Sequence, residues 1–204
     1  MRVLIACEFS GIVRDAFRER GHYAVSCDLL PTEREPSHHF IGDVRNYFLM
    51  GNHLYGYWDL LIAFPPCTYL CNSGVRWLYR RVNGKLEHNP VRHHQMEESA
   101  KLFRALLDAP VDKIAIENPI MHKRAASLIG RGQDQLIQPW QYGHGETKAT
   151  CLWLKNLPKL QSTEIVSGRR PRVHRASPGP DRWKERSRTL PGIAAAMAEQ
   201  WGNA

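Results

Sequence analysis

Short apolar runs alternate with amphipathic segments along most of the chain, a pattern typical of strands and helices that take turns in a parallel sheet. The apolar runs predict buried strands at residues 2–7, 22–27, 40–44, 60–64 and 113–119. Helices are predicted at residues 12–20, 95–109, 122–129 and 193–201. Residues 136–142 and 150–154 are expected to pair as strands around a glycine-rich turn.

These elements predict a single α/β domain over residues 1–204, with a mostly parallel sheet and helices on both faces. An antiparallel strand or hairpin is expected near its C-terminal end. Ser10 and Gly21 are the expected N-cap and C-terminal residues of the first helix. Residues 69–94 lack clean periodicity and contain Gly74, Gly84 and Pro90, so they predict a long loop over the site.

Composition argues against a membrane-spanning protein and against a secreted, disulfide-bonded one. No apolar run reaches the 18 or so residues of a membrane span, and the N-terminus runs directly into a strand without a secretory signal. The 5 cysteines are odd in number and scattered, which favours a reduced protein in the cytoplasm. We expect a monomer that binds no metal and no membrane.

The net charge of +8 fits a polyanionic partner. Basic residues concentrate between Arg169 and Arg188, where Trp183 and His174 lie among them. The segment is therefore interpreted as contacting phosphates, with a solvated surface loop as the alternative. The residues expected to bind the substrate through this segment are Arg169, Arg170, Arg172 and Arg175.

Polar and reactive side chains follow several of the predicted strands. Cys67 comes just after the strand 60–64 and the turn Pro65-Pro66, and Glu117 lies near the end of strand 113–119. Carboxyl ends of parallel strands are where open α/β sheets bind ligands, so Cys67 and Glu117 are candidates for neighbouring positions. A buried structural cysteine is the alternative for Cys67.

A thiolate and a carboxylic acid together suit one reaction. Carbon-5 of a pyrimidine becomes nucleophilic when a thiolate adds at C6 and an acid protonates N3. The acid must be kept protonated by burial, and the thiol must be shifted toward thiolate. Cys67 and Glu117 are predicted to fill these two roles.

The first strand, turn and helix could hold a nucleotide-like ligand, because backbone N–H groups at a helix start point outward. The single Gly11 is not a dinucleotide fingerprint by itself. Asp28 follows about 20 residues after the turn, where such folds bind a ribose, and Asp43 could reach an adenine amine. Ordinary loop acids are the alternative for both.

Phe9-Ser10-Gly11-Ile12, the two strand-end acids, Phe64-Pro65-Pro66-Cys67 and Ile116-Glu117-Asn118-Pro119 occur in this order. In this set the chain resembles the cytosine-5 methyltransferases that use S-adenosylmethionine. The resemblance covers residues 1–119. It implies a Rossmann-like class I methyltransferase fold, with DNA as the substrate.

The resemblance also implies the roles of single residues. Cys67 would be the nucleophile, Glu117 would protonate the base, and Pro66 and Asn118 would contact the substrate. Arg76, a basic residue of the predicted loop 69–94, is also expected to contact the substrate. The residues that would bind the cofactor S-adenosylmethionine are Glu8, Phe9, Ser10, Gly11, Ile12, Asp28, Leu29, Asp43, Val44 and Pro65.

The second half departs from the family. It lacks a convincing Gln-x-Arg-x-Arg segment, so Lys148 in the turn 143–148 is expected to donate to the O2 of the base; the alternative is a solvent-facing lysine. No separate target-recognition domain is expected, which predicts short or relaxed sequence specificity. The compact form hints at a phage or mobile-element protein.

Several alternatives stay open. The substrate could be a free pyrimidine nucleotide or RNA, or the chain could be a catalytically silent nucleic-acid-binding protein. An amino-group methyltransferase would have Asp or Asn before the two prolines and an aromatic residue after them, whereas this chain has Phe64 and Cys67. A metal site of Cys67, Cys71, His93 and His94 lacks a second Cys pair at zinc-site spacing.

Overall fold

A seven-stranded sheet in the order β3-β2-β1-β4-β7-β9-β8 forms the centre of the molecule. The computed structural model describes residues 1–46, 57–175 and 177–203. The strands are β1 (Arg2–Ala6), β2 (Tyr23–Asp28), β3 (His39–Ile41), β4 (Leu60–Ala63), β7 (Lys113–Pro119), β8 (Gln135–Ile137) and β9 (Thr150–Lys155). Neighbours from β3 to β7 pair in parallel, whereas β9 runs antiparallel to both β7 and β8.

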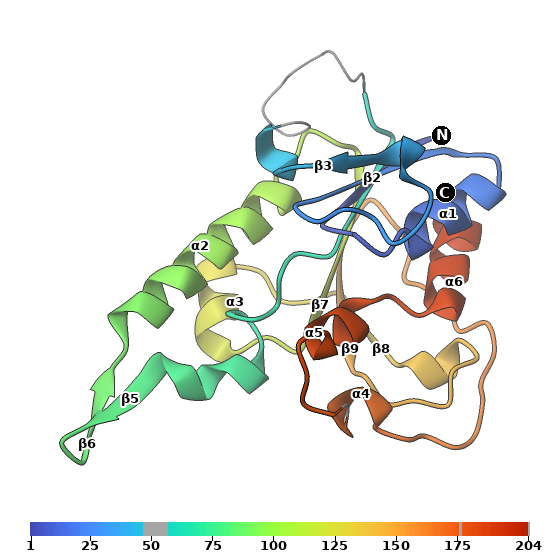
Figure 1. Ribbon diagram of the computed structural model, residues 1–204. Helices are drawn as coiled ribbons and strands as arrows, with labels where there is room; N and C mark the ends of the chain where they lie inside the picture. Colours follow the sequence, from blue (N-terminus) through green and yellow to red (C-terminus); the bar gives the residue numbers. More distant parts are fainter. Residues whose placement is uncertain (47–56, 176, 204) are drawn as a thin grey trace.

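Helices cover both faces of this sheet (Figure 1). α1 (Ile12–Glu19) and α6 (Pro191–Trp201) lie on one face, and α2 (Pro90–Leu107) and α3 (Lys123–Ile129) lie on the other. Alternate residues of a strand point to opposite faces. Thus Val3 and Ile5 of β1 join the core under α1 and α6, while Leu4 packs under α2. The strands at the centre read as continuous apolar runs because both faces are buried, as in β4, where all residues are buried.

The predicted fold class is confirmed, since the parallel sheet, the two helix layers and the antiparallel β9 match the expected Rossmann-like fold. Some boundaries were wrong. The third strand is His39–Ile41 rather than 40–44, and β8 ends at Ile137 because Pro139 begins the 3₁₀ helix η5 (Pro139–Gln141). Shorter helices not predicted from the sequence are η1 (Pro36–His38), α4 (Arg172–Arg175) and α5 (Arg182–Ser187).

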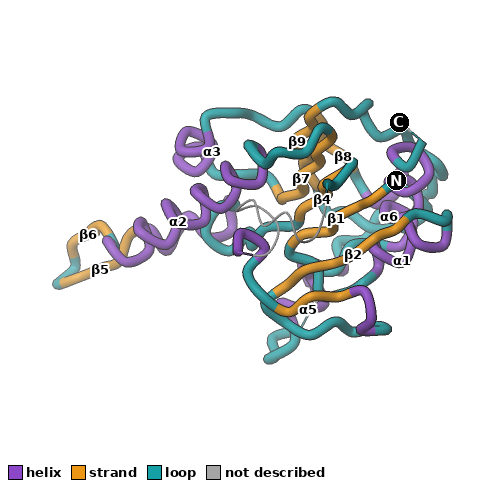
Figure 2. The backbone as a smooth tube through the Cα atoms, turned by 90° about the horizontal axis from the view of Figure 1, so that it is seen from above, coloured by secondary structure: helices purple, strands orange, loops and turns teal. Residues whose placement is uncertain are grey.

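The predicted loop at 69–94 is structured for most of its length. It contains the 3₁₀ helix η4 (Asn72–Leu78) and a hairpin of β5 (Tyr79–Val82) and β6 (Lys85–His88). Asn83 and Gly84 both have positive φ, of 50° and 79°, which a tight two-residue hairpin turn requires. α2 begins at Pro90, five residues earlier than predicted, because the Asn89 side chain caps it by accepting from the N–H of Arg92. Figure 2 shows the hairpin projecting away from the sheet.

The start of α1 also differs from the prediction. The N-cap position is Gly11, with a φ of 69°, and not Ser10. Gly21 ends the helix as predicted, with a φ of 81°. Within the described ranges, no helix combines the length and the apolar content that crossing a membrane requires.

Packing between α2 and the sheet provides a test of the core. The rings of Phe103 and Trp153 meet edge-on with centroids 5.0 Å apart, and both side chains are buried. We expect Phe103→Ala to lower the free energy of unfolding by about 3–5 kcal/mol, because it leaves a cavity between helix and sheet. Urea denaturation checks this. Arg104→Ala, at an exposed position of the same helix, should change the free energy of unfolding by less than about 0.5 kcal/mol.

Candidate active site

Cys67 lies just beyond β4 on a turn that is fixed to the neighbouring strand. β4 pairs in parallel with β7, so the ends of the two strands lie side by side. The Asn118 side chain at the end of β7 donates a hydrogen bond of 3.0 Å from Nδ2 to the carbonyl oxygen of Pro65. Asn118 is buried, and its Oδ1 has no hydrogen-bond partner within the part of the chain that the structure describes. Pro65 is also buried, whereas Pro66 is exposed and Cys67 is half-buried.

Glu117 and Lys148 come together beside Cys67. Because β9 runs opposite to β7, Lys148, two residues before β9, reaches the carboxyl end of β7. The charges of Glu117 and Lys148 act on one another and on the Cys67 thiol. Burial raises the pKa of the Glu117 carboxyl, and the Lys148 charge and a hydrogen bond with Thr150 partly offset this rise. The geometry thus brings together the three residues predicted as catalytic.

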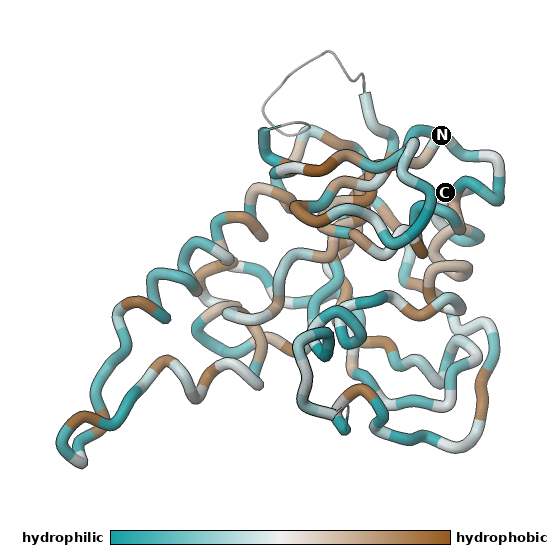
Figure 3. The backbone as a smooth tube through the Cα atoms, in the orientation of Figure 1, coloured by the Kyte–Doolittle hydropathy of each residue, from teal (hydrophilic) through white to brown (hydrophobic). Residues whose placement is uncertain are grey.

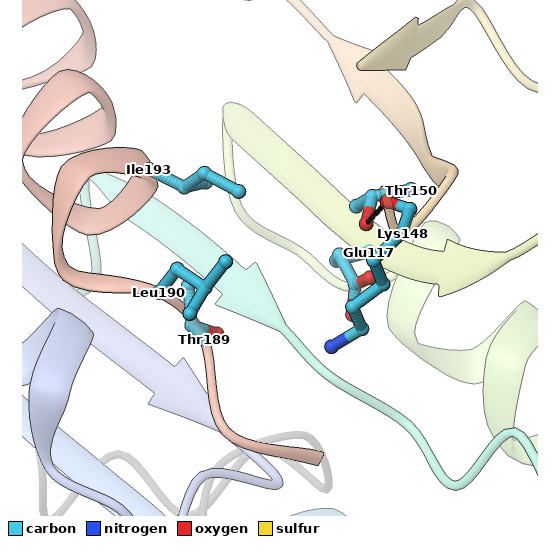
Figure 4. A pocket seen from close by; sticks show the side chains of 6 residues that line it. All are labelled: Glu117, Lys148, Thr150, Thr189, Leu190 and Ile193. Carbon is cyan, nitrogen blue, oxygen red and sulfur yellow. Dashed lines mark hydrogen bonds between the residues drawn. The ribbon is translucent and has the colours of Figure 1, made fainter. Parts of the chain in front are cut away.

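A small pocket lies over Glu117 and is closed by the C-terminal part of the chain. Figure 4 shows one wall made by Glu117, Lys148 and Thr150, and a facing wall made by Thr189, Leu190 and Ile193. Lys148 Nζ also donates to the backbone carbonyl of Arg186 at 2.9 Å. This contact holds the ammonium group at the edge of the pocket.

Cys71 contacts Cys67 and was missed as a site residue. It occupies the N-cap position of η4 without a side-chain capping hydrogen bond, and its side chain is buried. Its sulfur shares a hydrogen bond with the Cys67 sulfur. Its sulfur also lies 3.0 Å from the hydroxyl oxygen of Ser73. The Cys-x-x-x-Cys spacing was the available signal, because four residues make about one helical turn. From the sequence, Cys71 was a candidate metal ligand.

The two thiols titrate as a pair. The pKa of Cys71 is lowered to about 5, chiefly because Cys67 donates a hydrogen bond to it, with help from Ser73 and the backbone N–H of Gly74; burial opposes this. The pKa of Cys67 is raised, first by the same hydrogen bond, then by burial and by the charges of Cys71 and Glu117. The hydrogen bond thus favours a thiolate on Cys71 and a thiol on Cys67, which is the opposite of the shift predicted for the Cys67 nucleophile.

No group of three or more His, Cys, Asp or Glu side chains in residues 1–46, 57–175 and 177–203 is arranged to hold a metal ion. His93, part of the alternative metal site, instead stacks on His88 with ring centroids 3.5 Å apart.

The predicted cofactor turn lies between β1 and α1. The buried carboxylate of Glu8 accepts from the backbone N–H of Val13 at 2.7 Å and from the hydroxyl of Ser10 at 3.1 Å. Glu8 therefore stabilises the start of α1, the role that had been predicted for Ser10. Burial raises the pKa of Glu8. Phe9 is buried and meets the ring of Trp183 at 6.0 Å, and Ile12 is half-buried.

The two strand-end acids lie on adjacent strands. Asp28 ends β2, and its carboxylate accepts from the N–H of Leu30 at 2.9 Å. Burial raises the pKa of Asp28. Asp43 follows β3 and is engaged by Arg45, whose Nε lies 3.0 and 3.1 Å from its two oxygens. This hydrogen bond lowers the pKa of Asp43.

The other residues predicted to bind cofactor or substrate have different exposures. Leu29 is exposed to 72%, while Val44 is buried. Arg76 belongs to η4, but its side chain lies outside the described part of the chain.

The basic segment 169–188 packs back onto the molecule. The Arg169 guanidinium lies 3.8 Å from the centre of the Trp140 ring, and Arg172 pairs with Glu146 at 2.7 Å. Arg170 and Arg175 are exposed. At the end of the segment, Arg188 forms two hydrogen bonds with Glu33, of 2.7 and 2.6 Å. Two of the four arginines predicted to contact phosphates thus have partners within the protein.

Comparisons with known proteins return structures only. No family model matches the chain, and no curated protein sequence matches it. One similar structure is titled as a "putative DNA modification methyltransferase" encoded within an Escherichia coli prophage, at 13% identity and a TM-score of 0.49 over 82% of this chain and 52% of that one. Another is a mutant of Spodoptera frugiperda DNMT2, at 14% identity and a TM-score of 0.41 over 81% of this chain and 54% of that one. The chain spans about half the length of each, and the likeness at these identities concerns the fold alone.

Proposed function

We propose that the protein transfers a methyl group from S-adenosylmethionine to carbon-5 of cytosine in DNA. The observation that carries this proposal is the meeting of Cys67 with Glu117 at the ends of two adjacent parallel strands. A nucleophilic sulfur beside a carboxyl group with a raised pKa is what addition to a pyrimidine ring requires.

The reaction divides between these groups. As the Cys67 sulfur bonds to C6, its proton passes to the Cys71 thiolate, with which it already shares a hydrogen bond. Protonated Glu117 donates to N3 of the base, which turns C5 into an enamine carbon able to take the methyl group. A water molecule then takes the C5 proton while the N3 proton returns to Glu117, which expels the Cys67 thiolate and restores the aromatic ring. Cys67 recovers the proton that Cys71 had accepted. Lys148, whose charge acts on both Cys67 and Glu117, donates to O2 of the base.

The cofactor would lie across the ends of β1, β2 and β3. S-adenosylmethionine supplies an electrophilic methyl group when it is bound. The chain suits such a ligand because the order of strands reverses beside β1, which is where open α/β sheets bind nucleotides. Asp28, at the end of β2, can accept from ribose hydroxyls.

The first experiment tests the nucleophile and the acid. A duplex carrying 5-fluorocytosine should become covalently attached to Cys67 when the cofactor is present. Fluorine replaces the C5 proton whose loss would otherwise release Cys67. Cys67→Ser should abolish attachment and turnover, and Glu117→Gln should lower turnover at least about a hundredfold while both bind S-adenosylhomocysteine normally. Gel shift and peptide mass spectrometry detect the adduct.

The same assay separates the alternatives. Attachment through Cys71, or full activity of Cys67→Ser, would contradict the assigned nucleophile. If dCMP or RNA is methylated and DNA is not, the substrate is the free nucleotide or RNA and not DNA. Binding of DNA with no methyl transfer to any of them would favour a silent binding protein.

The second prediction concerns the cofactor acids. Asp28→Ala should weaken S-adenosylhomocysteine binding by about 1–3 kcal/mol, because ribose hydroxyls lose their acceptor. Asp43→Ala should weaken this binding by less, since the Asp43 carboxylate already accepts hydrogen bonds from Arg45. Calorimetry measures both, with Asp112→Ala before β7 as the control. Unchanged affinity in Asp28→Ala would remove Asp28 from the site.

The third prediction concerns the thiol pair. Because the pKa of Cys71 is lowered to about 5, alkylation of the pair by iodoacetamide should persist as the pH falls and be lost only below about pH 5. In Cys71→Ser, the onset of Cys67 alkylation should shift to pH 9 or above, since burial and Glu117 still raise its pKa. Peptide mass spectrometry across pH gives both profiles, and Cys151→Ser serves as the control. Identical profiles in wild type and Cys71→Ser would show that the thiols are uncoupled.

A further inference from the structure

Residues 72–89, which we call the arm, project from the body of the molecule (Figure 2). Among their described side chains, the buried Leu78 and the partly buried Val75 pack against the core. The arm consists of η4, the β5–β6 hairpin and Asn89. Both hairpin strands lie in a two-stranded sheet of their own, and all their residues are exposed except the half-buried Val82. Leu86 near the tip is exposed to 67%. A hairpin of this size is only marginally stable by itself, so its attachment matters.

The arm is anchored at its base and free at its tip. His88 stacks on His93 of α2, and Tyr79 meets both rings edge-on. The N–H of Asn89 donates to the carbonyl of Leu78 at 2.9 Å, which closes the base of the arm. These contacts hold the hairpin at a fixed angle to α2.

The base of the arm is also tied to the segment that carries Cys67. Arg92, in the first turn of α2, donates to the carbonyl of Thr68 at 2.8 Å, and its guanidinium lies 4.2 Å from the centre of the Tyr69 ring. At Gly74 the backbone passes so close that an added Cβ would lie 2.5 Å from the Thr68 carbonyl. A ligand that binds the hairpin is therefore held at a fixed position relative to Cys67.

The hairpin is basic on both faces. Its strands carry Arg80, Arg81 and Lys85 against the single acid Glu87. The register places Arg81 opposite Leu86, and Arg80 opposite Glu87. Since neighbouring residues alternate between faces, one face presents Arg81 with the apolar Leu86, and the other presents Arg80 with Lys85. Figure 3 shows this mixture as a largely hydrophilic hairpin with one hydrophobic stretch.

We propose that the β5–β6 hairpin enters the major groove of duplex DNA beside the target base. The inference rests on the proposed function for its substrate. A two-stranded ribbon fits the roughly 12 Å major groove of B-DNA, where arginine can bond guanine and an apolar side chain can meet the thymine methyl group. Both faces of the hairpin are exposed, and a groove can contact both, whereas the flat surface of a partner protein would contact only one. The major groove of A-form RNA is too narrow and deep for such a ribbon.

Two variants test the hairpin. In the first, Arg80→Gln, Arg81→Gln and Lys85→Gln remove its positive charges without shortening it. In the second, Asn-Gly replaces residues 80–87, which keeps the facing pair Tyr79 and His88 and so the anchor on α2. The matched control, Lys101→Gln, Arg104→Gln and Lys159→Gln, removes the same charge from exposed positions elsewhere.

Fluorescence anisotropy with a 24-base-pair duplex, without cofactor, measures binding at several salt concentrations. Both arm variants should bind at least about tenfold more weakly than the control at 150 mM salt, with a salt dependence shallower by about 2 to 3 in log–log slope. Wild-type protein should lose similar affinity for a duplex whose cytosines carry glucosylated hydroxymethyl groups, because these fill the major groove. Affinity for S-adenosylhomocysteine should stay unchanged.

Three results would overturn the proposal: arm variants that bind the duplex as the control does, full affinity for the glucosylated duplex, or equal binding and equal loss with double-stranded RNA. The assay needs no methyl transfer. Absence of turnover on every substrate would therefore count against the proposed function while leaving the test of the arm intact.

Discussion

The hydrogen bond from Asn118 to the carbonyl of Pro65 is the contact on which the candidate active site depends. It joins two strand ends that the sheet has already placed side by side, and it fixes a turn that proline keeps out of the sheet ladder. Neighbouring residues of β7 point to opposite faces. Asn118 can thus secure the turn from one face while Glu117 points to the pocket under α6 on the other.

Electrostatics inside the site follow from this placement. Burial favours the uncharged form of Glu117, while the hydrogen bonds around Cys71 favour a thiolate. Lys148 supplies the matching positive charge, and the Arg186 carbonyl holds its ammonium group. The two pKa shifts therefore have different physical causes, burial for Glu117 and hydrogen bonding for Cys71.

The sequence revealed the features that depend on local pattern. Leu60–Ala63 is buried on both faces, so it reads as a continuous apolar run, and the parallel topology then brings Cys67 and Glu117 to one edge. The hairpin was missed because its strands bury neither face and show no alternation of polar and apolar residues. Asn83-Gly84 was the available signal for it.

Contacts between distant parts of the chain were out of reach of pattern reasoning. The pairing of Arg188 with Glu33 joins positions 155 residues apart. No local periodicity encodes such pairs. The same holds for the stacking of Arg169 on Trp140, which depends on where the C-terminal segment comes to rest.

The reversed direction of β9 gives the two edges of the sheet different tolerance to insertion. The segment before β9 carries Lys148 and borders the pocket, so added residues there would displace the ammonium group. The segment after β9 leaves at the opposite edge, where the Asn156 side chain donates to the Asp112 carbonyl at 3.0 Å, ahead of β7. Exposed loops at this second edge can therefore accept a tag or an inserted domain without disturbing the chemistry. At β9, the loop that precedes the strand is the one where an insertion would disturb the site. In the parallel strands, it is the loop that follows each strand.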